Sequence, residues 1–293
     1  MSTRGENATI DRVGVIGAGA MGHGIAQVAV LAGYQVTLFD VNEAALRGGL
    51  ERIQANLDKG VELGKVEPEE RDRALAAISI TTTLSDAGKD ASLVIEAAPE
   101  DLDLKREIFG KLDAASPPHA VLATNTSSLS VTRIAEATKD PGRVLGMHFF
   151  NPVHIMKLLE LVRTEHTTES TIATARAAGA AMGKTCILVM DSPGFASSRL
   201  GLILGMEAVR MLDEGVASAE DIDIAMELGY GHPMGPFRLA DLVGLDVRLA
   251  VAEYLYRETG SERFKPSETI KRLVSEGKLG KKTGEGFYKW NNE

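Results

Sequence analysis

The chain has 293 residues, of which 44% are hydrophobic and 25% charged, and its formal net charge is −9. These proportions are ordinary for a globular protein with room for two domains. The acidic balance argues against a broad nucleic-acid or anionic-membrane surface, and no apolar stretch is long enough to span a bilayer. The first 12 residues lack an apolar signal segment. We therefore expect a cytoplasmic protein with no nucleic-acid or membrane partner.

The only cysteine, Cys186, excludes an intramolecular disulfide. It lies in the apolar run Thr185-Cys186-Ile187-Leu188-Val189-Met190. A catalytic thiol would need a partnered base nearby. We expect Cys186 to be a buried strand residue.

The first two thirds of the chain alternate short apolar runs with helical patterns. A strand at 13–17, a helix at about 20–32 and a strand at 35–40 form one βαβ unit, the size of a mononucleotide-binding half. Two polar helical segments, 42–64 and 68–78, should then project from the sheet as a hairpin. Further strands are predicted at 78–83, 91–97, 120–124, 144–149, 158–163 and 185–190, with helices at 101–115, 130–137 and 168–182. This alternation predicts a Rossmann-like, doubly wound and mainly parallel sheet.

The pattern changes at Asp191-Ser192-Pro193-Gly194. Beyond this point only helical patterns occur, at about 195–214, 218–228, 236–259 and 267–276. The sequence therefore predicts an α/β domain over residues 1–190, with the helical hairpin at about 42–78. A second, all-helical domain is predicted over 191–293.

A complete glycine turn, Gly17-Ala18-Gly19-Ala20-Met21-Gly22, joins the first strand to the first helix. In such a turn Gly17 permits the tight bend, Gly19 lets the backbone approach a pyrophosphate, and Gly22 lets helix and strand pack closely. The pyrophosphate would lie against the N–H groups and positive dipole of the helix start. The turn predicts a dinucleotide-binding site and a nicotinamide-dependent dehydrogenase.

Asp40 stands at the end of the second strand, 18 residues past Gly22. Its carboxylate would accept hydrogen bonds from the adenosine ribose and repel a 2′-phosphate. No Arg or Lys follows within six residues. These observations favour NAD over NADP, although the glycine turn by itself would also suit FAD.

Three polar segments stand at or within later strands. Oxidation of a hydroxyl group needs a base, and His148 at a strand end suits this role because imidazole titrates near working pH. Glu160 lies among apolar residues, so its charge needs a partner; it would orient His148 and stabilise the imidazolium. Ser127 and Asn125 could donate to a substrate oxygen. A purely structural His148 is the alternative, and no cluster has zinc-ligand spacing, so no metal is expected.

Together these segments resemble the L-3-hydroxyacyl-CoA dehydrogenase family, in particular its 3-hydroxybutyryl-CoA dehydrogenase branch. The resemblance covers nearly the whole chain and includes three motifs of the second domain. The motifs are Gly17–Gly22, Thr124-Asn125-Thr126-Ser127-Ser128, His148-Phe149-Phe150-Asn151-Pro152, Asp191-Ser192-Pro193-Gly194-Phe195, Gly231-His232-Pro233-Met234-Gly235-Pro236 and Gly280-Lys281-Lys282-Thr283-Gly284-Glu285-Gly286-Phe287-Tyr288.

The resemblance implies roles for individual residues. It makes His148 the catalytic base, Glu160 its partner and Ser127 the substrate-binding serine. It places Glu100 and Lys105 near the nicotinamide end of the cofactor. The cofactor-binding set that follows is Gly17, Ala18, Gly19, Ala20, Met21, Gly22, Asp40, Glu100, Lys105 and Asn125. It also implies a homodimer formed through the C-terminal helical domain.

The substrate side departs from the family in one place. Ser198 stands where the family usually has an asparagine that contacts substrate; a serine still donates one hydrogen bond, directly or through water. We expect the chemistry to survive, and leave substrate affinity and preference open. We also expect Asn151 to bind substrate. Lys59 and Lys65, on the hairpin expected to cover CoA, are phosphate contacts or simply solvated side chains.

The sequence therefore predicts the reversible, NAD-dependent oxidation of a short-chain (S)-3-hydroxyacyl-CoA to 3-oxoacyl-CoA. One alternative is a dehydrogenase of the same scaffold acting on a sugar acid such as L-gulonate, which would need no CoA site. The other is a non-catalytic, NAD-binding structural protein.

Overall fold

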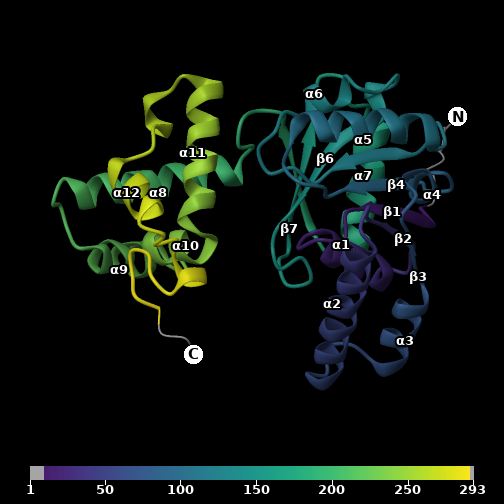
Figure 1. Cartoon of the computed structure of the whole chain (residues 1–293), viewed down its shortest axis with the longest axis horizontal. Helices are drawn as coiled ribbons and strands as arrows, with labels where there is room; N and C mark the ends of the chain where they lie inside the picture. Colours follow the sequence, from purple (N-terminus) through teal and green to yellow (C-terminus); the bar gives the residue numbers. More distant parts are fainter. Residues whose placement is uncertain (1–9, 291–293) are drawn as a thin grey trace, which may run out of the picture. The chain divides into compact units, whose positions relative to one another are not determined.

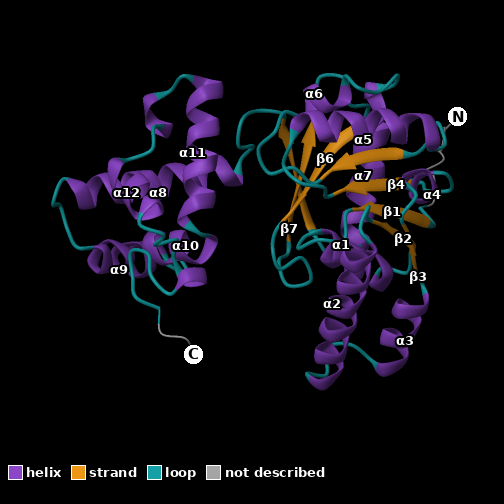
Figure 2. Ribbon diagram, in the orientation of Figure 1, coloured by secondary structure: helices purple, strands orange, loops and turns teal. Residues whose placement is uncertain are grey.

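A computed structural model describes residues 10–290. The chain divides into two compact units between Asp191 and Ser192. Among the described residues, all strands of the sheet belong to the first unit, and the second unit consists of helices and loops (Figure 2). The predicted fold class, a Rossmann-like sheet with a second all-helical domain, is confirmed.

The first unit is built on one eight-stranded sheet with the order β3-β2-β1-β4-β5-β6-β7-β8. Neighbouring strands are parallel except β6 and β7. The chain moves outward from β1 in both directions, which is the doubly wound arrangement. The strands are β1 (Arg12–Ile16), β2 (Gln35–Phe39), β3 (Ile78–Thr81), β4 (Leu93–Glu96), β5 (Val121–Thr124), β6 (Val144–Phe149), β7 (Leu158–Arg163) and β8 (Thr185–Met190).

Seven α-helices accompany this sheet within residues 10–191, and α2 and α3 extend together from it as a hairpin (Figure 1). Asn42 and Asp101 begin α2 and α5 by accepting hydrogen bonds from the backbone of Ala44 and Leu104. The five-residue helix α4 was not predicted, because a single turn carries too little periodicity to recognise. The helices are α1 (Gly22–Leu31), α2 (Glu43–Glu62), α3 (Pro68–Ala76), α4 (Leu84–Gly88), α5 (Leu102–Ala115), α6 (Val131–Ala135) and α7 (Glu169–Ala181).

The second unit packs its own core, which includes Leu202, Met206, Phe237 and Leu255. The single helix predicted over 236–259 is wrong: the chain forms two helices there, separated at Gly244. This glycine has φ +105°, outside the helical region and disfavoured for other residues. The helices are α8 (Ser197–Asp213), α9 (Ala219–Tyr230), α10 (Pro236–Val243), α11 (Leu245–Thr259) and α12 (Glu268–Ser275).

Cys186 lies in a strand, as predicted, but the expectation that it is buried is wrong. Its strand, β8, is the edge of the sheet and pairs only with β7 among the described strands. Cys186 is half-buried, and Ile187 and Met190 in the same strand are exposed. The partial burial raises the pKa of the Cys186 thiol.

No helix within residues 10–290 combines the length and apolar content needed to cross a membrane.

Candidate functional site

The carboxyl ends of β1, β2, β4, β5 and β6 lie at one edge of the sheet, where open α/β sheets bind ligands. A cavity of about 500 Å³ opens at this edge. Its walls come from the glycine turn, from the end of β2 and from the segment after β4. The lining residues are Ile16, Gly17, Gly19, Ala20, Met21, Phe39, Asp40, Val41, Ala97, Ala98, Pro99, Leu104 and Ile108.

The glycine turn has the shape that a dinucleotide requires. Gly17 has φ +101°, and a Cβ at Gly22 would lie 1.7 Å from the Gly17 carbonyl oxygen. A Cβ at Gly19, by contrast, would meet no atom within 4 Å. Packing therefore demands two of the glycines, while Gly19 leaves open space beside the cavity and the start of α1. These features fit a pyrophosphate held by backbone N–H groups at the helix start.

Asp40 fastens the glycine turn to the end of β2. Its carboxylate accepts hydrogen bonds from the backbone N–H groups of Ala18 at 2.9 Å and Asn42 at 3.1 Å. A carboxylate has about four acceptor positions, so two remain for ribose hydroxyls in the cavity that Asp40 lines. Arg52 of α2 donates a hydrogen bond to the Ala18 carbonyl at 2.9 Å. This contact was not predicted, because helix periodicity does not indicate which distant backbone group a side chain will reach.

His148 and Glu160 are opposite each other in the one antiparallel pair of the sheet, β6 and β7. Their Nδ1 and Oε2 atoms are 2.8 Å apart, and the two side chains are 8% and 0% exposed. The 12-residue spacing between them in the sequence is thus explained by the antiparallel pairing, because the chain ends β6, turns, and comes back along β7 to the position opposite His148. The ring of Phe150 lies 4.5 Å from that of His148, centroid to centroid. The pair provides a desolvated imidazole with one nitrogen held by a carboxylate.

The segment after β5 is tied to both neighbouring strand ends. The Asn125 Oδ1 atom accepts a hydrogen bond from the Phe149 backbone at 2.9 Å, next to His148. The Ser127 N–H donates to Glu100 Oε1 at 3.0 Å, and the Ser127 hydroxyl lies 3.4 Å from the same oxygen. Ser127, Asn125 and Glu100 therefore gather at the same sheet edge as His148.

Glu96, the last residue of β4, was missed by the sequence analysis. It is fully buried, and its Oε1 atom lies 2.6 Å from the Lys105 ammonium group, which is 1% exposed. Lys105 also lies 3.6 Å from Glu100 Oε2. The signal was available: an acid closes the apolar run of β4, much as Glu160 lies within that of β7.

The remaining predicted substrate residues lie elsewhere in the chain. Asn151 is exposed in the loop that follows β6, and its peptide bond to Pro152 is cis. Lys59, on the last turn of α2, is exposed and pairs with Glu62 at 2.7 Å. Lys65 lies between α2 and α3, and Ser198 is in the first turn of α8 in the second unit. None of these four lines the cavity at the sheet edge.

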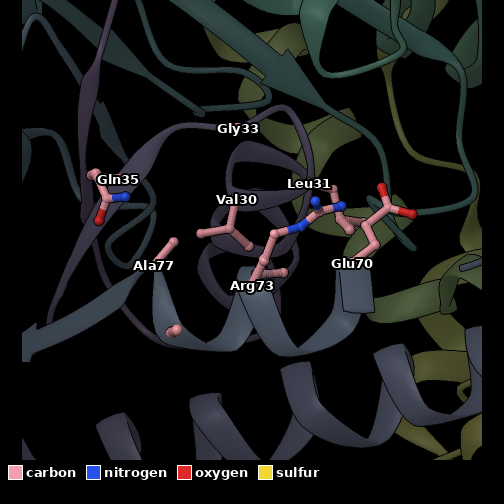
Figure 3. A pocket seen from close by; sticks show the side chains of 9 residues that line it. Val30, Leu31, Gly33, Gln35, Glu70, Arg73 and Ala77 are labelled. Atoms are coloured by element: carbon pink, nitrogen blue, oxygen red, sulfur yellow. The ribbon is translucent and has the colours of Figure 1, made fainter. Parts of the chain in front are cut away.

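A second hollow, of about 460 Å³, lies beside the end of α1 and α3. Figure 3 shows the side chains that line it. Gln35, the first residue of β2, lies in its wall, so it stands at the amino end of that strand, away from the edge just described. Glu70 and Arg73 are its charged residues, and no histidine or cysteine lines it. It adds nothing to the chemistry at the carboxyl ends. Within residues 10–290, no group of three or more His, Cys, Asp and Glu side chains is arranged for a metal ion.

Comparison with known families covers both units. Residues 12–192 match the model of the 3-hydroxyacyl-CoA dehydrogenase NAD binding domain, and residues 194–290 match that of the 3-hydroxyacyl-CoA dehydrogenase C-terminal domain. The chain belongs to the 3-hydroxyacyl-CoA dehydrogenase family. It is an NAD-dependent oxidoreductase of the class that acts on CH–OH groups, and the predictions of enzyme class and of NAD are confirmed.

Individual relatives of this dehydrogenase are similar over nearly their whole length. A Mycobacterium tuberculosis 3-hydroxybutyryl-CoA dehydrogenase is 47% identical over 281 residues, 95% of this chain and 98% of the relative. The crystal structure of (S)-3-hydroxybutyryl-CoA dehydrogenase from Ralstonia eutropha is 40% identical, with a TM-score of 0.93 over 97% of this chain and 100% of that chain. A pyridine-carboxylic acid dehydrogenase structure, described as an NAD⁺-dependent dismutase, is 30% identical, with a TM-score of 0.78 over 97% and 92%.

Proposed function

We propose that this dehydrogenase oxidises (S)-3-hydroxyacyl-CoA to 3-oxoacyl-CoA reversibly, with a short acyl chain such as 3-hydroxybutyryl. The observation that carries the proposal is the buried His148–Glu160 contact of 2.8 Å at the sheet edge. The names of relatives at 40–47% identity support the acyl chain length and the CoA ester.

The base in this reaction is the Nε2 atom of His148. The Glu160 carboxylate accepts a hydrogen bond from Nδ1 of His148. This contact favours the tautomer with the proton on Nδ1, in which Nε2 carries an acceptor lone pair. The substrate hydroxyl proton moves to Nε2 as its C3 hydrogen leaves as hydride. Bound NAD⁺ supplies the hydride acceptor. Glu160 then stabilises the imidazolium ion until the proton passes to solvent.

Ser127 holds the substrate oxygen in this proposal. Its hydroxyl lies at the carboxyl end of β5, beside the end of β6 where His148 is located. A donor at this place stabilises the negative charge that develops on the oxygen as its proton leaves, or as hydride adds in the reverse direction. Asn125 fixes the β5 end to the β6 end through the Phe149 backbone.

The CoA portion is proposed to lie along the α2–α3 hairpin, with Lys59 and Lys65 as phosphate contacts. Asn151 and Ser198 are proposed to contact the acyl part. Serine is shorter than the asparagine usual at position 198, so we expect a water-mediated contact there.

We also propose a homodimer through the helical unit. That unit exposes large apolar side chains, an arrangement typical of protein interfaces. Among them are Leu200 (69% exposed), Val216 (60%), Leu228 (83%) and Tyr230 (79%). Sedimentation should give twice the mass of the chain, and a monomer at micromolar concentration would contradict this part of the proposal.

The substrate class is tested by following NADH oxidation with acetoacetyl-CoA and NAD⁺ reduction with free L-gulonate. We expect turnover with acetoacetyl-CoA only. Turnover with the sugar acid alone would replace the acyl-CoA proposal. NADH binding without turnover of either substrate would indicate a non-catalytic protein.

A further inference from the structure

From the contacts beneath the sheet edge we infer that the buried ion pair Glu96–Lys105 positions the substrate-binding serine, Ser127, through Glu100. These are positioning residues, which, on the function proposed above, set the reaction geometry without touching the substrate.

The Glu96 carboxylate accepts hydrogen bonds from three neighbours. Its Oε1 atom accepts from the Lys105 ammonium group at 2.6 Å and from the Ala98 N–H at 2.6 Å. Its Oε2 atom accepts from the Thr124 hydroxyl at 2.7 Å. Glu96 ends β4 and Thr124 ends β5, so the Glu96 side chain joins the two strand ends. Both residues are fully buried, and their hydrogen bond is therefore shielded from water.

Lys105 connects Glu96 to Glu100. An ammonium group has three N–H donors, and here they face Glu96 Oε1, the Ala98 carbonyl at 3.2 Å and Glu100 Oε2 at 3.6 Å. With 1% of its side chain exposed and these three partners, Lys105 acts on the cavity through its neighbours. Ala98 is one of the residues that line the cavity.

Glu100 is the link between the ion pair and the segment after β5. Its Oε2 atom faces Lys105, while its Oε1 atom accepts from the Thr126 hydroxyl, from the Ser127 N–H at 3.0 Å and from the Ser128 hydroxyl at 3.3 Å. A single carboxylate oxygen thus holds three consecutive residues. Its position depends on the cation, and the position of the cation depends on Glu96.

The direct test is Glu96→Gln, which keeps the side-chain shape and removes the charge. The Lys105 ammonium group then has Glu100 as its only carboxylate among the contacts described, and should draw Glu100 away from Ser127. The matched control is Glu107→Gln, which removes the same charge from the exposed Lys111–Glu107 pair on helix α5.

Hydrogen exchange gives a readout that does not depend on activity. We expect the amides of Ser127, Ser128 and Leu129 to exchange about tenfold faster in Glu96→Gln, because their local hydrogen bonds open more often. Exchange in α7 should stay unchanged, and Glu107→Gln should match the original protein in both segments. Unchanged exchange at 127–129 in a folded Glu96→Gln protein would overturn the inference.

Kinetics test whether the effect passes through Ser127. With acetoacetyl-CoA we expect kcat of Glu96→Gln to fall about 10- to 100-fold, as for a misplaced contact. The double variant Glu96→Gln/Ser127→Ala should be no slower than Ser127→Ala. Losses that multiply would show independent roles and overturn the inference.

An original protein that is inactive on acetoacetyl-CoA would refute the proposed function. The hydrogen-exchange result would still decide whether Glu96 positions Ser127.

Glu96→Gln leaves a buried cation with a weaker partner and could unfold. The second variant, Glu96→Gln/Lys105→Met, removes both charges at similar volume, a replacement that folded proteins often tolerate. It should fold and show the same faster exchange and lower kcat. Normal kcat in this variant would overturn the inference, as would failure of both variants to fold, which would assign the pair to folding alone.

Discussion

In the α/β unit the buried acids Glu96 and Glu160 face a lysine and a histidine, whereas in the helical unit Asp223 and Asp241 face backbone and aromatic donors. Asp241 is fully buried and accepts from the Phe287 N–H, the Tyr288 N–H and the Trp290 indole, each at 2.9 Å. Its three partners are fixed in position and none of them titrates near neutral pH.

Asp223 plays a similar part at the start of α10. It accepts from the backbone N–H groups of Phe237 at 2.8 Å and Arg238 at 3.0 Å, and from the Tyr288 hydroxyl at 2.8 Å. A carboxylate at this place satisfies helix-start donors and the positive end of the helix dipole. Burial and the hydrogen bond to Asp223 raise the pKa of Tyr288.

The function of a buried acid depends on its partners and on its place in the fold. Where its partners are fixed backbone and aromatic donors, we expect it to anchor the chain; where its partner is a lysine or histidine at the ligand edge of the sheet, we expect it to serve the proposed chemistry. The motif Gly280–Tyr288 illustrates the first case, because a Cβ at Gly286 would lie 2.2 Å from Asp241 Oδ1. That glycine makes room for the aspartate and has no contact that suggests catalysis.

The largest effect is expected from His148→Gln. Loss of the base should lower kcat about 10³-fold, while the glutamine amide can still donate to Glu160. The Kd for NADH, measured by fluorescence titration, should be unchanged because the glycine turn is intact. The control is His166→Gln, an exposed histidine in the loop after β7. Full activity of His148→Gln would remove His148 from the mechanism.

A second prediction sharpens the rule, because Asp113 is an acid with a largely buried side chain and a cationic partner at the opposite sheet edge. Arg143 precedes β6 and donates to Asp113 Oδ1 at 2.8 Å, with side chains 8% and 6% exposed. Asp113→Asn should destabilise the protein by about 3 kcal/mol, measured by urea unfolding at pH 7, without changing kcat. The exposed Asp72→Asn is the control. A loss of kcat would show that a buried acid affects turnover even at the opposite sheet edge, and would contradict the rule.

The same pair gives a pH dependence. Burial opposes ionisation of Asp113, but hydrogen bonds from Arg143 and the Lys139 N–H outweigh it and hold the pKa of Asp113 below its usual value. The stabilisation is therefore present above about pH 4, the unfolded pKa, and is lost as the pH falls through the lower folded pKa. The stability difference between the original protein and Asp113→Asn should shrink as the pH falls below about 4; a constant difference would contradict this.

Asp241→Asn tests the helical unit. An amide in place of the carboxylate turns one acceptor into a donor that faces other donors, so we expect a loss of about 2 kcal/mol, or about 5 °C in Tm. Activity per folded molecule should not change. Calorimetry and an assay well below Tm measure the two quantities, and a normal Tm would show that the aspartate does not anchor the chain.

The smallest effect is expected from Asp40→Asn. The amide still accepts from the Ala18 N–H, but the charge that favours ribose hydroxyls and repels a 2′-phosphate is lost. We expect KM for NADH to rise about tenfold and the preference over NADPH to decrease. An unchanged ratio of kcat/KM for the two cofactors would assign the preference to other residues.

Much of the fold followed from local patterns, because apolar periodicity distinguishes strands from helices and the glycine turn has one geometry. The pairing of His148 with Glu160 could be anticipated because a lone acid in an apolar strand needs a partner. Glu96 carries the same signal and was missed, since it stands at the end of its run. The break at Gly244 and the edge position of β8 depend on tertiary packing, which periodicity does not record.

The most direct test of the comparison measures two variants side by side: kcat with acetoacetyl-CoA for Glu160→Gln and for Asp241→Asn, each at a temperature where calorimetry shows it folded. In the proposed function Glu160 orients the base, so its variant should lose about 100-fold in kcat. Asp241 anchors the chain, so its folded variant should keep the original rate. Equal losses in the two variants, or none in Glu160→Gln, would contradict the division of buried acids into catalytic and structural ones.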